Sequence, residues 1–545
     1  MIDTTVLILA AGQLPDRQLG PAPLLHPHPL DLPAGSDFAL QRIVSHYREK
    51  QPEAQLVAVI DQQDQNHYHC LKNLVDLCLA IPSQTSVGAS LQTALSQLQS
   101  QLVIVNPITS LPCIGCIDSA TIVIGEELLQ RQNWSAFTNH HPNNRNELLS
   151  KLDQSYQEEP TSFPFTGLLA ANRLVLMQVL KQLSPGQKRD LGWVAALLLE
   201  QESTTVLRVP WYDLGHRATY ARSRRSQLIS RSHNRVDYNE IGDLIQKRSS
   251  SKSRLSGEAN YIRSLPLRLK RHFPALIDYS DSKGLELEYI PFPSLAELFL
   301  HWEIGIDGWK SIWKRLGFIL DEFGMQEKSI QQNCSWLYSQ KLEKRHVQLR
   351  QDSGNIHRNR FWTSPLVING HVLLAPNQCA ELVKKALIGL EEKCPLQLIH
   401  GDLCFNNILA DPLHASLRLI DPRGETAEDQ PIPVGYGDPR YDLIKLLHSG
   451  CYYYDLVIHE LYELSCTEDL NWIAKLIPPR HAYIVSEQLQ LFVRQRGLSL
   501  EEERWLTASL FFSMLPLHGD NPNRQQMLCL IGCCIAQDCF SILLP

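Results

Sequence analysis

The chain has no uninterrupted apolar run of roughly twenty residues, the length that a membrane-spanning helix needs. Its opening residues hold only a short apolar run, residues 6–11, without the basic start and longer apolar stretch of a secretory signal. Cysteine is sparse, since 14 cysteines among 545 residues do not make the dense pattern of a disulfide-stapled secreted domain. We therefore expect a cytoplasmic protein with reduced thiols and no transmembrane segment.

An excess of positive charge is also missing, because 51 lysines and arginines stand against 58 aspartates and glutamates. A large nucleic-acid-binding surface usually makes a chain basic, so we expect no nucleic-acid partner. The composition is that of an ordinary globular protein, with 44% hydrophobic and 20% charged residues. A chain of this length is too long to fold around a single hydrophobic core, so we expect two to four domains.

The first 220 residues alternate strand-like and helix-like patterns. A continuous apolar run, residues 6–9, ends in Ala10-Ala11-Gly12, as a buried parallel strand entering a tight loop would. Further strands are expected at 56–60 and 102–106, and helices at 38–50 and 90–98. Strands that alternate with helices predict an α/β domain with a mainly parallel sheet.

A polar, arginine-rich stretch separates this part from the rest, and we interpret residues 221–232 as a basic linker. Beyond it we expect a second domain, residues 233–545. A small sheet is predicted within 233–292 and a mostly helical lobe in 293–545, with one strand-like interruption between 396 and 421. The predicted organisation is therefore an α/β domain followed by an α+β domain with two lobes.

The strongest chemical signal is Leu-Ile-His-Gly-Asp-Leu-Cys-Phe-Asn-Asn-Ile-Leu at 398–409, followed by Leu-Arg-Leu-Ile-Asp-Pro at 417–422. Two apolar runs flank a polar loop, which predicts that Asp402, Asn407 and Asp421 lie at one end of a hairpin. Phosphoryl transfer needs a carboxylate to orient a hydroxyl and oxygen ligands for Mg²⁺. The alternative is a buried turn in which His400 and Asp402 are satisfied core polar groups.

These motifs resemble the aminoglycoside phosphotransferase and choline kinase family, small-molecule relatives of protein kinases. The resemblance covers residues 233–545 and implies that Asp402 is the catalytic base and that Asn407 and Asp421 bind Mg²⁺. Gly-Asp-Pro-Arg-Tyr-Asp-Leu at 437–443 resembles another segment of that family. By that likeness Asp442 braces the catalytic loop together with His400, although an acid at a helix start is also common without any such role.

The small lobe adds a lysine and a glutamate to this resemblance. Lys247 ends a strand-like run, and Glu258 follows eleven residues later, which resembles the family's pair that holds the phosphates of ATP. A surface lysine and a helix-start glutamate are the alternative. The segment from Glu288 to Ile290 resembles the hinge that binds adenine through its backbone. No glycine-rich loop is seen, which argues against a protein kinase.

Asp421 is followed by Pro-Arg-Gly, and Asp-Pro-Arg-Gly resembles kinase-like proteins linked to capsule and surface polysaccharide. This likeness implies a sugar or sugar derivative as the acceptor and an association with polysaccharide machinery. The cofactors it implies are ATP and Mg²⁺. The sequence itself names neither the acceptor nor the oligomeric state.

The N-terminal loop resembles that of sugar-nucleotide nucleotidyltransferases, in which backbone amides of a glycine-containing loop approach phosphates. The resemblance implies nucleotide contacts by Ala11, Gly12, Arg17 and Gly88. Two departures stand out: Leu-Leu-His occupies 24–26 where a lysine is expected, and Asn106 stands where an aspartate would hold metal. We expect a domain that keeps the fold without the reaction. A plain α/β loop is the alternative.

Three functions follow from these patterns. The favoured one is a small-molecule kinase that transfers the γ-phosphoryl group of ATP to an alcohol. The second is a bifunctional nucleotidyltransferase and kinase. The third is a non-catalytic nucleotide-binding regulator, against which the intact set of Asp402, Asn407 and Asp421 argues.

Overall fold

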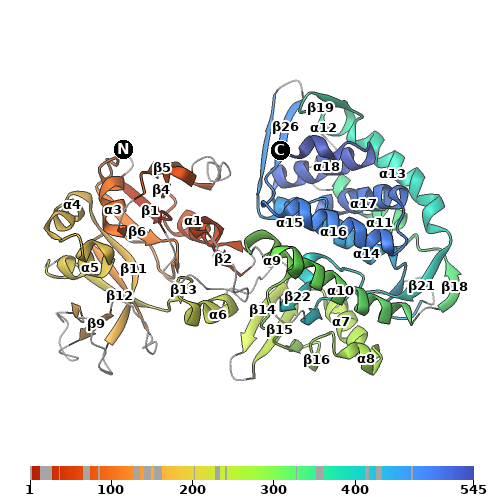
Figure 1. Cartoon of the computed structure of the whole chain (residues 1–545), viewed down its shortest axis with the longest axis horizontal. Coiled ribbons are helices and arrows are strands. Elements are labelled where there is room, and N and C mark those ends of the chain that lie inside the picture. Colours follow the sequence, from red (N-terminus) through yellow and green to blue (C-terminus); the bar gives the residue numbers. More distant parts are fainter. Residues whose placement is uncertain are drawn as a thin grey trace. The chain divides into compact units, whose positions relative to one another are not determined.

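The chain divides into two compact units, with the division after Gln227 (Figure 1). We call them the N-terminal unit and the C-terminal unit. Within the part of the chain that the structure describes, no helix has both the length and the apolar character that a membrane crossing requires. This computed structural model describes residues 3–12, 28–35, 37–64, 74–83, 86–126, 136–139, 149–151, 162–201, 203–226, 234–239, 242–302, 304–326, 328–351, 360–411, 416–424, 432–467 and 470–545.

A mixed sheet forms the centre of the N-terminal unit. Four parallel strands lie in the order β5-β4-β1-β6, so the parallel sheet expected from the sequence is confirmed for this central part. Strand β11 then pairs antiparallel with β6, β8 and β9, and β12 pairs in parallel with β8. The bounds are β1 (Thr4–Leu9), β4 (Gln55–Asp61), β5 (Leu77–Ile81), β6 (Leu102–Pro107), β8 (Thr121–Gly125), β9 (Ala136–Asn139), β10 (Leu149–Lys151), β11 (Ser162–Asn172) and β12 (Thr205–Val209).

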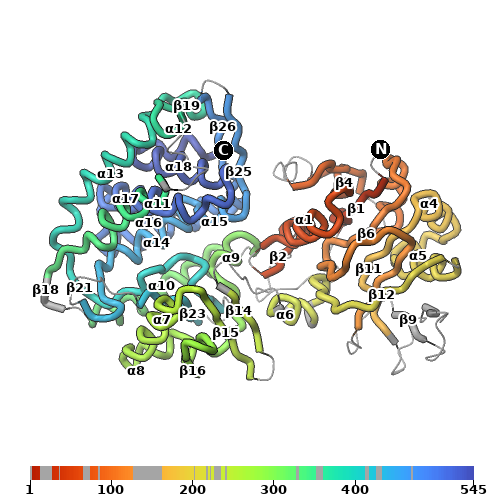
Figure 2. The backbone as a smooth tube through the Cα atoms, turned by 180° about the vertical axis from the view of Figure 1, so that it is seen from behind, coloured from red at the N-terminus to blue at the C-terminus, as the bar shows by residue number. Residues whose placement is uncertain are grey.

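Helices cover both faces of this sheet. Helices α3 (Val87–Leu95), α4 (Arg173–Gln182) and α5 (Leu191–Leu199) pack together on one face, where alternate strand residues such as Leu7 and Val57 join their core. Helix α1 (Ala39–Lys50) lies on the other side of the sheet (Figures 1 and 2). Burial of every described residue of β8 and most of β4 explains why these strands read as continuous apolar runs.

The predicted linker at 221–232 is wrong in its first half, because residues 221–226 belong to helix α6 (Arg217–Ser226). The carboxylate of Asp213 accepts hydrogen bonds from the backbone N–H groups of Gly215 and His216 and so caps the turn before the helix. Tyr220 and Ser223 are buried. An apolar anchor and a cap therefore turn an arginine-rich stretch into a packed helix.

The C-terminal unit begins with an antiparallel sheet in the order β14-β15-β17-β16. Its strands are β14 (Asn234–Asn239), β15 (Leu244–Ser249), β16 (Leu276–Ser280) and β17 (Gly284–Glu288). Helix α7 (Lys252–Ser264) packs Leu255, Ala259 and Ile262 against Leu285 and Leu287 of β17. The helix begins at Lys252, in a stretch rich in lysine, arginine and serine, and Glu258 lies within it and not at its start.

Helices dominate the remainder of this unit, and α17 and α18 form its most extensive helix pair (Figures 1 and 2). The prediction of a single strand-like interruption is wrong, because a sheet of order β20-β19-β26-β25 also lies here. Strand β26 alternates exposed and buried residues, a period-two pattern that marks a half-buried strand. The elements are α9 (Leu295–His301), α10 (Gly305–Gly324), α11 (Ser339–Gln351), α13 (Pro376–Glu391), α14 (Arg440–Gly450), α15 (Tyr454–Ile458), α16 (Ala482–Gln495), α17 (Leu500–Met514), α18 (Pro522–Ala536), β19 (Leu366–Ile368), β20 (His371–Leu373), β25 (Tyr462–Cys466) and β26 (Asn471–Leu476).

Candidate functional site

The residues of the main motif lie on a short hairpin. Strand β22 (Ile408–Asp411) pairs with β23 (Ser416–Leu419) so that Ile408 faces Leu419. The N–H group of Ile420 then donates to the carbonyl oxygen of Asn407 at 3.0 Å. The residues just outside the two strands, Asn407 and Asp421, therefore lie at the same end of the hairpin. Asp402 precedes it, in the loop after β21 (Cys394–Leu398).

Lys247 joins this hairpin to the small sheet. Its Nζ atom lies 2.8 Å from Oε1 of Glu258 on α7 and also forms an ion pair with Asp421. Glu258 is buried and the Lys247 side chain is only 13% exposed, whereas the Asp421 side chain is 50% exposed. Asp421, 174 residues after Lys247, thus joins Lys247 and Glu258 in one chain of charges, with the Asp421 carboxylate at its exposed end.

The charge states of this chain follow from burial and pairing. Burial would lower the pKa of Lys247, but the carboxylates of Asp421 and Glu258 outweigh it and raise this pKa above its ordinary value. Lys247 is therefore a fixed cation. Burial raises the pKa of Glu258, and the charge of Lys247 opposes that rise. Removing Lys247 would leave a buried carboxylate without its counter-charge.

The backbone around Asp421 is held in an uncommon shape. Asp421 has a φ of 57°, in the left-handed region that non-glycine residues seldom occupy. Three residues on, Gly424 packs against helix α7, and a Cβ atom there would lie 1.9 Å from the carbonyl oxygen of Gly257. Because Gly257 precedes Glu258, this contact fixes the segment that carries Asp421 against the helix that carries Glu258.

Two cations hold the carboxylate of Asp402. Lys445 on α14 places its Nζ atom 2.8 Å from Oδ1, and Arg423 places a guanidinium nitrogen 3.0 Å from Oδ2. Burial alone would raise the pKa of Asp402, but Lys445 and Arg423 outweigh it and hold this pKa well below its ordinary value. Asp402 is therefore ionised at neutral pH, as an acceptor for a hydroxyl proton must be.

Asn407 and Asp421 offer the kind of oxygen donors that Mg²⁺ prefers. The Nδ2 atom of Asn407 donates to the backbone oxygen of Asp402 at 2.8 Å, which orients the amide and leaves its oxygen on the other side. One amide oxygen and one carboxylate fit a metal that takes few protein ligands and completes its shell with phosphate oxygens and water. The described residues hold no group of three or more His, Cys, Asp or Glu that could bind a metal alone.

Asp442 supports the loop that carries Asp402. Its carboxylate accepts hydrogen bonds from the N–H groups of His400 at 2.7 Å and Gly401 at 2.9 Å. Burial raises the pKa of Asp442 to about 7. Gly401 has a φ of 78°, and a Cβ atom there would lie 2.7 Å from the Arg423 side chain. His400 is fully buried, and burial lowers its pKa to about 4, so its ring is neutral.

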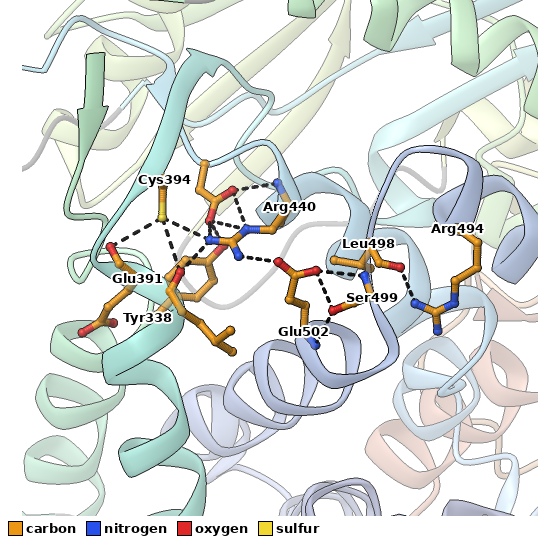
Figure 3. Close-up of polar contacts among 10 residues, drawn as sticks. Tyr338, Glu391, Cys394, Arg440, Arg494, Leu498, Ser499 and Glu502 are labelled. Atoms are coloured by element: carbon orange, nitrogen blue, oxygen red, sulfur yellow. Dashed lines mark hydrogen bonds and ion pairs between the residues drawn. The ribbon is translucent and has the colours of Figure 1, made fainter. Parts of the chain in front are cut away.

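A second polar network anchors the start of α14 (Figure 3). The Arg440 guanidinium bonds to both carboxylate oxygens of Asp438, to Glu502 at 2.7 Å and to the carbonyl oxygen of Leu390 at 2.7 Å. Asp438 is fully buried and also accepts from the hydroxyl of Tyr338 at 3.0 Å. Because α14 carries both Asp442 and Lys445, this network indirectly positions the loop of Asp402.

The expected hinge lies at the end of β17. The N–H group of Glu288 donates to the carbonyl oxygen of Ala275, while the Glu288 carboxylate accepts from the N–H group of Ala275 at 3.0 Å. Its side chain borders a cavity of about 500 Å³ that Phe273 and Arg418 also line. Lys247, Glu258, Asp402, Asn407 and Asp421 do not line that cavity. Ile290 is buried just beyond the strand, and the N–H group of Tyr289 between them donates to the carbonyl oxygen of Asp243 at 3.1 Å.

Sequence reasoning missed three cations around Asp402, namely Lys341, Arg423 and Lys445. Arg423 stands in the Asp-Pro-Arg-Gly motif, which was read as a sign of substrate class and not as a contact of Asp402. Lys445 lies one helical turn after Asp442, and that spacing is the only local signal for it. Lys341 belongs to α11, 61 residues before Asp402, and no local pattern links the two.

The nucleotide contacts expected of the N-terminal loop remain predictions, and the structure shows what its residues contact within the chain. The N–H group of Gly12 donates to Oδ2 of Asp61 at 2.9 Å, so this amide is already bound to a carboxylate and Ala11 beside it is half-buried. A Cβ atom on Gly88 would lie 2.8 Å from the carbonyl oxygen of Lys188, so close packing requires that glycine. Arg17, like residues 24–26, lies outside the described residues.

Asn106, which stands where a metal-binding aspartate was expected, is fully committed to internal hydrogen bonds. Its oxygen accepts from the hydroxyl of Tyr47 at 2.9 Å, and its nitrogen donates to the carbonyl oxygens of Pro107 and Ser110 at 2.7 and 2.9 Å. The side chain is fully buried. Its role is to satisfy buried polar groups, as a structural asparagine does.

Comparisons with known proteins found no matching family model and no matching curated protein. Solved structures that are similar include a Bacillus anthracis protein assigned as a glucose-1-phosphate thymidylyltransferase, in complex with sucrose (11% identity, TM-score 0.34, 42% of this chain and 97% of that one). A nucleotidyl transferase from Methanothermobacter has 15% identity, a TM-score of 0.29, and coverage of 41% and 97%. A UDP-glucose pyrophosphorylase complexed with UDP-glucose has 12% identity, a TM-score of 0.31, and coverage of 42% and 98%. In each case both the sequence identity and the TM-score are low.

Proposed function

We propose that the C-terminal unit is an ATP-dependent phosphotransferase that acts on a small hydroxyl-bearing acceptor. The observation that carries this proposal is the ion-paired set of Lys247, Glu258 and Asp421, with Asp421 at the hairpin end that also bears Asn407. Phosphoryl transfer depends more on charged groups held in fixed positions than on covalent chemistry by the protein. This set of residues supplies such charged groups.

In the proposed reaction the acceptor oxygen bonds to the γ-phosphorus of ATP while the bond between that phosphorus and the β,γ-bridging oxygen breaks. The hydroxyl proton passes to the ionised carboxylate of Asp402, and the products are the phosphorylated alcohol and ADP. Lys247 binds the phosphates and Glu258 fixes it. Bound Mg²⁺, held by Asn407 and Asp421, would neutralise phosphate charge.

The adenine is proposed to bind the backbone between Glu288 and Ile290. A sugar or sugar derivative of surface polysaccharide metabolism is the acceptor that Asp-Pro-Arg-Gly at 421–424 favours. For the N-terminal unit we propose a nucleotidyltransferase-like domain that binds a nucleotide sugar or acts as a scaffold. Asn106 supports the loss of its reaction, because its oxygen is held by Tyr47.

The test combines ligand binding with turnover. ATP with Mg²⁺ should raise the melting temperature of the wild type, since a ligand at a hundredfold excess over its dissociation constant stabilises the native state by about 2.7 kcal/mol. Asp421→Ala should lose the metal-dependent rise. Asp402→Asn should keep the rise but lose transfer of the labelled γ-phosphate to a sugar pool by about 10³-fold or more.

The matched control is Asp307→Asn, which removes a carboxylate that is 97% exposed. It should keep both binding and transfer. Full activity in Asp402→Asn would exclude Asp402 as the base. Binding without transfer to any alcohol would favour a non-catalytic regulator, and pyrophosphate release from a nucleoside triphosphate and a sugar phosphate would favour the bifunctional alternative.

A further inference from the structure

The guanidinium group of Arg423 lies beside the base of the proposed reaction, which so far assigns it no role. One of its nitrogens lies 3.0 Å from Oδ2 of Asp402. To lose its proton to Asp402, an acceptor hydroxyl must lie about 2.6–3.2 Å from that carboxylate, with the γ-phosphorus about 3–3.5 Å beyond it. A cation that bonds to Asp402 is therefore a close neighbour of the phosphoryl group during transfer.

The main chain at Arg423 is anchored to the loop that carries Asp402. Its N–H group donates to the carbonyl oxygen of His400 at 2.8 Å. Its side-chain stem packs against Gly401, where an added Cβ atom would lie 2.7 Å from that of Arg423. Arg423 also follows Asp421, the proposed metal ligand, by only two residues. The side chain thus starts from a fixed point in the segment that carries the metal ligand and reaches the base.

Lys445 binds the other oxygen of Asp402 and differs from Arg423 in its surroundings. Its Nζ atom lies 2.8 Å from Oδ1, and its side chain is 13% exposed, against 33% for Arg423. Burial would lower the pKa of Lys445, but Asp402 outweighs it and raises this pKa above its ordinary value. Lys445 is therefore the buried, permanent counter-charge of the base, and Arg423 is the cation on its more open side.

The charge of Arg423 also acts on the lysine and glutamate pair of the small sheet. Burial raises the pKa of Glu258, and the charges of Lys247 and Arg423 both oppose this rise. Arg423 is therefore close enough to influence the place where Lys247 is proposed to bind the phosphates of ATP. A guanidinium has five N–H donors in a planar fork, so one such group can bond to a carboxylate and to phosphate oxygens at once.

We propose that Arg423 is a catalytic residue that binds the oxygens of the transferred phosphoryl group in the transition state. This inference rests on the proposed phosphotransferase function and assigns it a further residue. The bond from the acceptor oxygen to the γ-phosphorus forms, the bond to the β,γ-bridging oxygen breaks, and the hydroxyl proton passes to Asp402. Arg423 keeps its proton throughout, and its positive charge stabilises the negative charge on the phosphoryl oxygens.

The experiment compares a ground-state probe with a transition-state probe by calorimetric titration of the full chain with Mg²⁺. A non-hydrolysable ATP analogue represents the ground state, and ADP with aluminium fluoride represents the phosphoryl group during transfer. The wild type should bind ADP about 100-fold more tightly when aluminium fluoride is present, since transition-state analogues bind more tightly than ground-state ligands. Arg423→Met should lose most of this gain, while its affinity for the ATP analogue changes less than about threefold.

A second variant and two comparisons isolate the role of the guanidinium. Arg423→Lys keeps the charge without the planar fork, so it should retain binding of the ATP analogue and only part of the gain; it also serves if the methionine variant fails to fold. The matched control is Arg524→Met, whose partners Asp520 and Glu460 are exposed, and it should keep the full gain.

Lys445→Met tests the different role of the buried cation. Lys445 and then Arg423 hold the pKa of Asp402 low against burial, so loss of Lys445 should raise this pKa. The acid limb of the release of labelled γ-phosphate from ATP should move to higher pH, and the gain with aluminium fluoride should remain.

Three results would overturn this inference alone. They are a full gain in both Arg423 variants, no gain in the wild type, and a loss of affinity in Arg423→Met that is equal for the ATP analogue and for ADP with aluminium fluoride. The last would make Arg423 a residue for nucleotide binding only. Failure of the wild type to bind the ATP analogue would instead contradict the phosphotransferase itself.

Discussion

Arg440→Met is the substitution whose effect on stability the structure specifies best. It removes the guanidinium that bonds to Asp438, Glu502 and the carbonyl oxygen of Leu390 (Figure 3). The fully buried Asp438 carboxylate would keep only the hydroxyl of Tyr338 and the N–H group of residue 440. Breaking a buried ion pair in this way costs about 3–5 kcal/mol.

Urea unfolding measures this loss. With a slope of about 3 kcal/mol per molar urea, the midpoint should fall by about 1 M or more. Arg440→Lys should recover only part of the stability, because one ammonium group cannot bond to Asp438 and Glu502 in the fork geometry of a guanidinium. The double variant Arg440→Met with Asp438→Asn should lose less unfolding free energy than the two single variants lose together, since no unpaired charge is left.

Arg524→Met is the matched control. Arg524 pairs with Asp520 and Glu460, whose side chains are 70% and 41% exposed, and such pairs contribute about 1 kcal/mol or less. A loss of under about 1 kcal/mol in Arg440→Met would refute the reasoning, because it would mean that the Asp438 carboxylate is compensated without Arg440.

Three further predictions concern other parts of the chain. Gly424→Ala should lower stability by about 1–3 kcal/mol and weaken ATP binding, because its Cβ meets the Gly257 carbonyl oxygen; urea unfolding and ATP titration measure both. His346→Phe should make the free energy of unfolding less sensitive to acid. Burial lowers the pKa of His346 to about 4, so the unfolded chain binds a proton first as pH falls from 6.5 towards 4, and the wild type should lose about 2 kcal/mol more than the variant between pH 7.5 and pH 5. Asn106→Asp should destabilise the N-terminal unit by about 3 kcal/mol and gain no Mg²⁺ binding, because a carboxylate would face two carbonyl oxygens.

Each of these has an outcome that would contradict it. Unchanged ATP affinity in Gly424→Ala would mean that the segment after Asp421 adjusts without moving that carboxylate. Equal acid sensitivity of wild type and His346→Phe would show that His346 binds its proton as readily in the folded chain as in the unfolded one. A stable Asn106→Asp variant whose melting temperature rises with Mg²⁺ would restore the case for an active nucleotidyltransferase.

The central strands of the N-terminal unit and the strand and hairpin that carry Asp402, Asn407 and Asp421 could be predicted from the sequence. Buried strands such as 6–9 and 102–105 are continuous apolar runs, and that pattern is local. The linker prediction failed at α6 because it was based on arginine content and overlooked the local cap at Asp213 and the tyrosine at 220, whose burial depends on the surrounding fold. The extra sheet with β26 was missed because short strands between helices leave weak signals.

The sequence by itself determined which residues carry the candidate chemistry, because the motif around Asp402 and the acid at Asp421 are set by covalent order and spacing. Only the tertiary structure decided what those residues contact. It joined Lys247 to Asp421 across 174 residues and brought Arg423 and Lys445 to Asp402. It also showed that Asn106 is bound internally. Charge pairing and burial arise between segments distant in the chain, so local sequence cannot encode them.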